Sequence, residues 1–198
     1  MSGGVGTEET YRGFAADRGL APAEGFWPGP VTPLLAKGGA LQPALRGRLT
    51  PALEAVVARH SYSTDGGRFD FNVVFARIEE SQPFVPRLMC ERLGRWTDTS
   101  HYGFEVRNTR QWTESEVLNT RYRVTTSPFQ DDNWLRQLFA PTFVDWLAHE
   151  PPEDFSFELA YGSLLCSIED DDPGREGLEA LWRSAATVAG RIKDESTD

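Results

Sequence analysis

The chain has 198 residues, of which 39% are hydrophobic and 25% charged, and its formal net charge is −10. This composition is typical of a globular protein with one core, and it excludes collagen, a coiled coil and a wholly disordered chain. The acidic surplus disfavours binding to nucleic acid or to an anionic membrane surface. Because no apolar run is long enough to cross a bilayer, the sequence also predicts no membrane insertion.

The acidic side chains gather toward the C-terminus. Residues 1–128 hold 15 basic and 14 acidic side chains, whereas residues 129–198 hold 5 basic and 16 acidic ones. Such an excess keeps a protein in solution, and it can also steer a cationic partner toward the acidic part.

The two cysteines bear on the cellular location. Cys90 and Cys166 cannot make a disulfide framework, and each lies in an apolar run where a free thiol acts as a small buried hydrophobe. Residues 1–10 lack the basic and apolar regions of a secretory signal. The sequence therefore predicts separate reduced thiols and a cytoplasmic protein.

The N-terminal part is expected to be irregular apart from one helix. Residues 1–6 are rich in Gly and are expected to form a disordered tail. A helix is expected over about 8–18, capped by Thr7. The segment 21–43 contains five prolines together with large apolar side chains, so it is expected to wrap around the domain.

Strands follow. The pattern predicts a hairpin of strands 53–64 and 68–79 around the turn Asp65-Gly66-Gly67. The second of these strands is apolar on both faces, which indicates a central position in a sheet. Further strands are expected at about 45–49, 87–93 and 104–107, and one continuous strand at 115–126.

The last third mixes helices with a second hairpin. Two helices are expected at about 131–149, separated by Pro141. Alternating strands at 155–161 and 164–168 are joined at Gly162-Ser163. A final helix is expected from Pro173 to about 193, followed by a disordered tail at 194–198. Its apolar stripe is Leu178, Leu181, Trp182, Ala185, Ala189 and Ile192.

Together these elements predict a single α+β domain over residues 7–193. A mainly antiparallel sheet, curved or two-layered, carries the C-terminal amphipathic helix and the helical pair at about 131–149. A partly closed barrel with a plugging helix is the alternative.

The run at 114–124 resembles a motif, roughly Glu-Ser-x-x-Phe-Asn-Arg-Arg-Phe-x-Val, in a family of proteins of unknown function from high-GC Gram-positive bacteria. The resemblance extends over most of residues 8–193 and includes the acidic helix start at Asp131-Asp132. Some members carry membrane-spanning helices ahead of this domain. The resemblance implies a fold unit and supplies no catalytic residues. This chain has Leu118, Thr120 and Tyr122 where the motif has Phe, Arg and Phe.

The chain carries no short catalytic or nucleotide-binding motif. Its histidines, His60, His101 and His149, are dispersed and lack metal-ligand spacing, so no metal site is expected; the alternative is a site made by His60, His101 and a distant carboxylate. No cofactor is expected. The acidic run at 169–172 is interpreted as a solvated turn that caps the final helix, because it lacks the alternating oxygen ligands of a calcium loop.

The best candidate for ligand contact is a polar row within the predicted strand 115–126. Asn119, Arg121 and Arg123 would share one strand face, and paired guanidinium groups suit a phosphate or a carboxylate. The competing interpretation is a solvent face whose arginines pair with Glu residues of a neighbouring strand.

The sequence thus favours a non-catalytic binding or protein-interaction domain, with another protein or a second copy of the chain as partner. The alternative is an enzyme without short motifs, such as a hydrolase that uses carboxylates and one histidine. A cleft that gathers His60 or His101 with buried carboxylates would favour the enzyme. An exposed apolar patch would favour the interaction domain.

Overall fold

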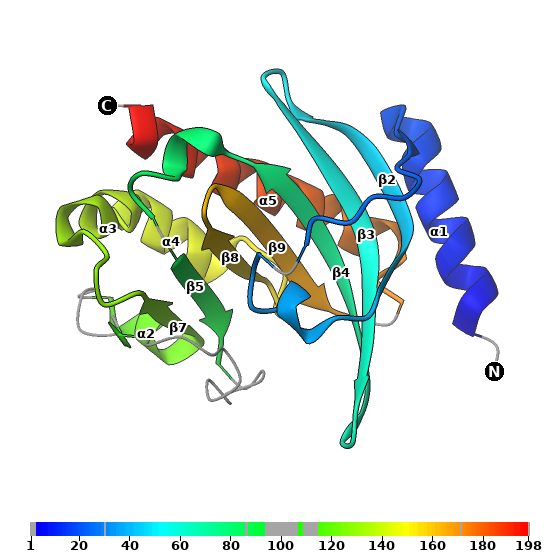
Figure 1. Ribbon diagram of the computed structural model, residues 1–198, viewed down its shortest axis with the longest axis horizontal. Coiled ribbons are helices and arrows are strands. Elements are labelled where there is room, and N and C mark those ends of the chain that lie inside the picture. Colours follow the sequence, from blue (N-terminus) through cyan, green and yellow to red (C-terminus); the bar gives the residue numbers. More distant parts are fainter. Residues whose placement is uncertain are drawn as a thin grey trace.

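The computed structural model describes residues 3–29, 31–85, 87–93, 107–108, 115–170 and 172–197. Within these residues nine strands form one open sheet in the order β1-β2-β3-β4-β9-β8-β5-β7-β6, and all pairings are antiparallel. The sheet is curved and its edges do not meet (Figure 1). The α+β prediction is confirmed, and the alternative of a partly closed barrel is wrong.

The strands are β1 (Ala21–Pro22), β2 (Ala40–Thr50), β3 (Leu53–Thr64), β4 (Gly67–Arg77), β5 (Arg87–Arg92), β6 (Arg107–Asn108), β7 (Tyr122–Thr126), β8 (Ser156–Ala160) and β9 (Ser163–Glu169). The helices are α1 (Gly3–Arg18), α2 (Glu116–Arg121), α3 (Asp132–Leu138), α4 (Pro141–His149) and α5 (Gly174–Thr197), with short 3₁₀ turns η1 (Leu35–Lys37) and η2 (Glu79–Ser81).

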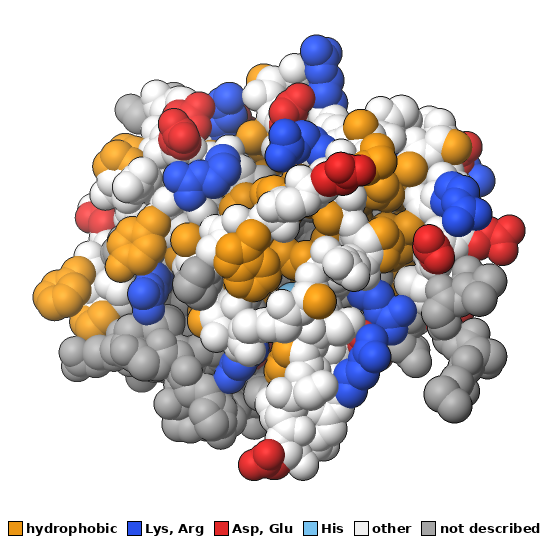
Figure 2. Space-filling model, turned by 45° about the vertical axis from the view of Figure 1, so that its right-hand side comes forward, with side chains coloured by type: hydrophobic (Ala, Val, Ile, Leu, Met, Phe, Trp, Pro, Cys, Tyr) orange, Lys and Arg blue, Asp and Glu red, His pale blue; other side chains and the backbone are white. Residues whose placement is uncertain are grey.

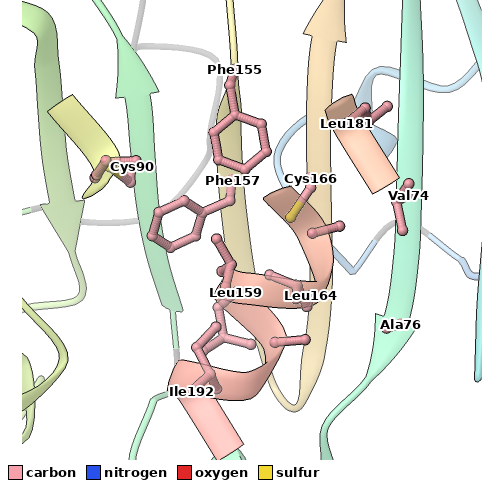
Figure 3. Close-up of a cluster of buried hydrophobic side chains, with 14 of the residues drawn as sticks. Val74, Ala76, Cys90, Phe155, Phe157, Leu159, Leu164, Cys166, Leu181 and Ile192 are labelled. Atoms are coloured by element: carbon pink, nitrogen blue, oxygen red, sulfur yellow. The ribbon is translucent and has the colours of Figure 1, made fainter. Parts of the chain in front are cut away.

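The larger apolar cluster lies between the sheet and the helices α1, α3, α4 and α5. In Figure 1, α5 crosses behind the strands, and Figure 3 shows Leu181 and Ile192 of this helix beside side chains of β4, β8 and β9. Every residue of the predicted α5 stripe is buried. Cys90 and Cys166 are free and buried in the same cluster, as the sequence predicts.

The opposite face of the sheet is covered by the Pro-rich segment, which we call the strap (residues 23–29 and 31–39). Leu34 and Leu35 of the strap are buried in a second apolar cluster with side chains of β3 and β4. The backbone N–H of Leu34 donates to Glu158 Oε2 at 3.0 Å, which ties the strap to β8. In Figure 1 the strap passes in front of the strands, as expected for a segment that wraps around the domain, but residues 21–22 and 40–43 of the same predicted irregular segment are strand, in β1 and β2.

With apolar clusters on both faces, β4 is buried on both sides. It pairs with β3 through Val57↔Val74 and with β9 through Val74↔Cys166. This confirms the central position that its apolar pattern predicts.

The prediction of one strand over 115–126 is wrong, because the first half is helix α2 and only Tyr122–Thr126 is strand. The Ser115 side chain accepts a hydrogen bond from the Leu118 N–H at 3.2 Å and so caps the helix. Leu118 and Tyr122 are both buried, as the alternation indicates. Their spacing of four residues suits a helix face as well as a strand face, which is why the pattern misleads.

The helical ends extend beyond the predicted bounds. α5 continues past residue 193 to Thr197, and α1 begins at Gly3. The last turn of α5 is held by the Trp134 indole, whose N–H donates to the Glu195 carbonyl at 3.0 Å. Helices α3 and α4 lie within 131–149 as predicted, and Asp131 caps α3 by accepting the Trp134 N–H at 2.7 Å.

Candidate functional site

The predicted polar row is not a row in the structure. Asn119 and Arg121 lie in α2, whereas Arg123 lies in β7. The Arg121 guanidinium donates to the Ala148 carbonyl in the last turn of α4, where a cation suits the helix dipole. Arg123 stands opposite Glu91 of β5 in the sheet register, the arrangement of the competing interpretation. Ligand binding by these three residues stays a prediction.

The histidines occupy separate environments. His60 is fully buried, and its Nε2 lies 2.7 Å from the Gly38 carbonyl of the strap. Burial lowers the pKa of His60, against the opposing effect of that hydrogen bond. His149 lies in the last turn of α4, 3.4 Å from a carboxylate oxygen of Asp145, and His101 lies outside the described residues. Within the described ranges, no group of three His, Cys, Asp or Glu side chains is placed to hold a metal ion.

One cavity, of about 680 Å³, lies between α1 and the β2–β3 edge and is lined by Arg59 and Arg68. Both guanidinium groups bind the same carboxylate, since Asp70 lies 3.1 Å from Arg59 and 2.9 Å from Arg68. Burial alone would raise the pKa of Asp70, but the hydrogen bonds from Arg68 and Ser61 and the two cationic charges hold it below its usual range. Asp70 therefore offsets one of the two positive charges, and a second carboxylate, that of Glu8, also lines the cavity.

A second cavity, of about 490 Å³, lies where the strap meets β2, and Trp27 stands half exposed at its wall. Its lining is mostly apolar residues and glycines, and it contains no histidine and one carboxylate, that of Glu24. Neither of these two cavities gathers a histidine with buried carboxylates.

The third cavity, of about 610 Å³, lies at the end of the sheet where three turns meet. Each turn directs one aromatic ring outward: Phe84 after β4, Phe129 before α3, and Tyr161 between β8 and β9. Their exposed fractions are 40%, 89% and 46%. We call these three residues the aromatic rim. Phenylalanine is usually buried, so three large exposed rings around one cavity are a feature that packing does not explain.

Hydrogen bonds hold the three turns together beneath the rim. The buried Gln130 side chain donates from Nε2 to the Phe84 carbonyl at 2.8 Å, which joins the first turn to the second. The Ser127 hydroxyl accepts the Phe129 N–H at 3.1 Å. The Ile78 N–H donates to the Gly162 carbonyl at 2.7 Å, which joins the end of β4 to the third turn. The rim is thus held on a fixed frame.

Tyr161 sits in a backbone conformation that its side chain disfavours. It has a φ of 49° and is the one non-glycine residue with a positive φ among those that the structure describes. With Gly162 at 76°, it forms a two-residue hairpin turn with positive φ at both positions, for which Asn-Gly is the favoured pair. A bulky residue here costs free energy, and such strain gathers at functional sites.

The floor and walls of the rim cavity are polar and anionic. Trp134 contributes its buried indole, and Gln82, Asn133 and Gln137 contribute amides. The charged lining residues are Asp131 and Glu195, and no Lys or Arg is among the lining residues. The Arg87 guanidinium lies 5.5 Å from the centroid of the Tyr161 ring, so this ring already contacts one cation.

The sequence analysis did not identify the rim, because turns are normally recognised by their polar and glycine residues. One signal was available: Phe84 and Phe129 each directly follow a proline, in Pro83-Phe84 and Pro128-Phe129. A large apolar residue next to a proline, outside any strand or helix, has no partner within its own element.

Other exposed large apolar side chains in the described residues are those of Trp27 and Val117. In the face that Figure 2 shows, hydrophobic side chains reach the surface at its left and centre, between charged ones.

Comparisons with known proteins give one structural likeness. No family model and no curated protein matches the chain. The crystal structure of the mycobacterial trehalose monomycolate transport factor A, TtfA, is similar in fold with a TM-score of 0.60. The two chains are 12% identical, and the likeness covers 96% of this chain and 94% of that one.

Mycobacteria belong to the high-GC Gram-positive bacteria that the sequence resemblance indicates. No helix in the described part of the chain is long and apolar enough to cross a membrane. At this identity the comparison shows a shared α+β fold.

Proposed function

We propose that this protein is a non-catalytic protein-binding domain and that the aromatic rim is its binding surface. The observation that carries the proposal is the outward display of Phe84, Phe129 and Tyr161 from three adjoining turns. Binding hot spots are enriched in aromatic residues that fill or surround a pocket. Full burial of an exposed ring of this size contributes about 1.5–3 kcal/mol. Phe129, at 89% exposure, can supply most of that, whereas Phe84 and Tyr161, which are already more than half buried, supply less.

The frame beneath the rim strengthens this proposal. Association requires that contacting groups lose conformational freedom, and a surface that is already fixed loses less. Gln130, which is buried and bonded to the Phe84 carbonyl, fixes two of the three turns before any partner arrives. The third turn is a tight hairpin that leaves the Tyr161 backbone little freedom.

The structural neighbour is compatible with a non-catalytic role, since that protein is a transport factor. We extend to this chain only the general idea of an accessory protein that works through binding. The buried free thiols of Cys90 and Cys166 suit a reducing cytoplasm, which we propose as its location. The enzyme alternative receives no support from the three cavities above, because none has a histidine in its lining.

Photo-crosslinking in the cells that naturally make the protein tests the proposal. A benzophenone amino acid replaces Phe129 and, in the control chain, Val117, which is 44% exposed on α2 and outside the rim. We expect a discrete adduct from position 129 that disappears when Phe84→Ser is added. Mass spectrometry then identifies a second protein or a second copy of this chain. The proposal fails if position 129 gives no adduct, or if position 117 gives the same one.

A further inference from the structure

We infer that the rim cavity accepts a Lys or Arg side chain of the partner protein. This inference rests on the proposed function and adds to it the chemistry of the partner. The first observation is the charge of the lining, which contains the carboxylates of Asp131 and Glu195 and no cationic side chain. A cavity with aromatic walls and carboxylates matches a long aliphatic chain that ends in a cation.

Asp131 and Glu195 both hydrogen-bond to Trp134, Asp131 through its carboxylate and Glu195 through its backbone carbonyl. Asp131 Oδ1 accepts the Trp134 backbone N–H at 2.7 Å, while the indole N–H donates to the Glu195 carbonyl at 3.0 Å. Glu195 also pairs with Arg191 at 2.7 Å, so its charge is balanced within the protein. Asp131 has no cation among its described ion pairs, and a carboxylate offers about four acceptor sites. Asp131 is therefore the principal anionic group for an incoming cation.

One ring of the rim, that of Tyr161, already contacts a cation. The guanidinium of Arg87 already lies 5.5 Å from the Tyr161 ring centroid. A ring presents a negative potential on its faces, so neighbouring rings of the rim attract a second cation in the same way. The methylene groups of Lys or Arg would lie against the exposed Phe84 and Phe129 rings.

The wider surroundings favour a cationic partner over an anionic one. The chain carries a net charge of −10, and residues 129–198, which supply α3, α5 and the second and third turns, hold 16 acidic and 5 basic side chains, although the acidic run at 169–172 lies at the far end of β9 from the rim. Such an excess raises the local concentration of cationic segments and their rate of encounter. An acidic segment would meet repulsion both at a distance and inside the cavity.

Titration with short peptides followed by NMR tests the inference on the full chain. The probes are acetyl-Leu-Arg-Leu-amide, the same peptide with norleucine in place of Arg, and the same with Glu. The reporter is the indole N–H signal of Trp134, assigned with Trp134→Phe, and the signal of the remote, buried Trp182 is the internal control. We expect the arginine peptide to bind at least about 5-fold more tightly than the norleucine peptide, as one cation–aromatic contact with a nearby carboxylate warrants.

A matched pair of variants assigns the preference to the cavity. Asp131→Asn keeps a good helix cap but removes the charge, and it should abolish the preference for arginine. Asp132→Asn changes the net charge equally at a neighbouring residue outside the cavity lining, and it should retain the preference. Added salt should weaken the arginine peptide more than the norleucine peptide.

The outcomes separate the inference from the proposed function. Equal binding of the arginine and norleucine peptides, stronger binding of the Glu peptide, or no shift of the Trp134 signal would each overturn the inference. The crosslinking at position 129 tests the proposed function, and its result does not depend on the peptide titrations. Equal loss of preference in Asp131→Asn and Asp132→Asn would also overturn it, because the effect would then be one of net charge alone.

Discussion

Tyr161 is the residue whose chemistry departs furthest from what its position favours. Its φ of 49° lies in the left-handed region, which costs a non-glycine residue roughly 1–2 kcal/mol. Nothing in the β8–β9 hairpin requires a tyrosine, since Asn-Gly would make the same turn without that strain. The tyrosine at this position costs the fold free energy. A role in binding, and not in folding, explains its presence.

Tyr161→Asn should therefore raise the free energy of unfolding, by about 1 kcal/mol, while it weakens partner binding. Denaturant titration measures the first effect and the crosslinking yield at position 129 the second. Tyr161→Phe is the control, because it retains both the ring and the strain and should change neither quantity much. A loss of stability in Tyr161→Asn would show that the ring contributes to packing.

His60 makes stability depend on pH. Its pKa is lowered in the folded protein by burial, so the unfolded chain binds a proton more readily. Stability that is fully present at pH 7 is then lost as the pH falls below about 6.5, the ordinary value for histidine. His60→Gln keeps a donor for the Gly38 carbonyl and removes the titration. We expect urea titrations at pH 7 and pH 5.5 to differ more for the wild type than for this variant; an equal difference would contradict the assignment.

At the scale of the elements, helix α5 is longer than its sequence suggests. The polar residues after position 193 predict a disordered tail. In the structure the helix continues to Thr197, and its Glu195 carbonyl accepts the Trp134 indole N–H. Ser196 is buried in the same turn. The last turn thus closes one side of the rim cavity.

Truncation after Lys193 should lower the free energy of unfolding by about 1–3 kcal/mol, because a buried indole N–H loses its acceptor. Thermal or urea unfolding followed by tryptophan fluorescence measures this change. Removal of Asp198 alone is the control and should have little effect. If both truncated chains unfold like the full chain, the last turn contributes nothing to the fold.

The elements that the sequence predicts well are those with a regular apolar period. The alternation at 68–79 places β4 in the centre of the sheet, and the stripe from Leu178 to Ile192 places α5 on it. The segment 115–126 fails because Leu118 and Tyr122 satisfy two periods at once, and a serine cap decides between them. The proline before Phe84 and before Phe129 marks these two residues, but the sequence could not bring them together with Tyr161, because the three meet only through the order of the strands in space.

At the scale of the whole molecule, the distribution of charge disfavours nucleic acid as a partner. The excess of acidic side chains over residues 129–198 is not offset by a strongly cationic cavity elsewhere, since Arg59 and Arg68 share Asp70 and Glu8 lines the same cavity. We expect no measurable binding to duplex DNA or RNA at physiological salt, whereas non-specific binders reach a Kd of about 10⁻⁴ to 10⁻⁶ M there. Fluorescence anisotropy with a labelled duplex is the measurement. Micromolar affinity that falls steeply with salt would reveal a cationic groove.

The strand order also has a consequence for how the protein is made. β4 leaves the ribosome directly after β3, but its other neighbour, β9, is synthesised only after about 85 further residues, and β8 and β9 then enter between β4 and β5. Until that moment the growing chain carries a long, apolar, unpaired strand edge, and α5, which covers one of its faces, does not yet exist. The two halves of the sheet therefore cannot pair with each other until the last fifth of the chain has been synthesised. Premature termination after β4 but before residue 163 would release a product prone to aggregate, and a chaperone that shields β4 during synthesis would raise the yield.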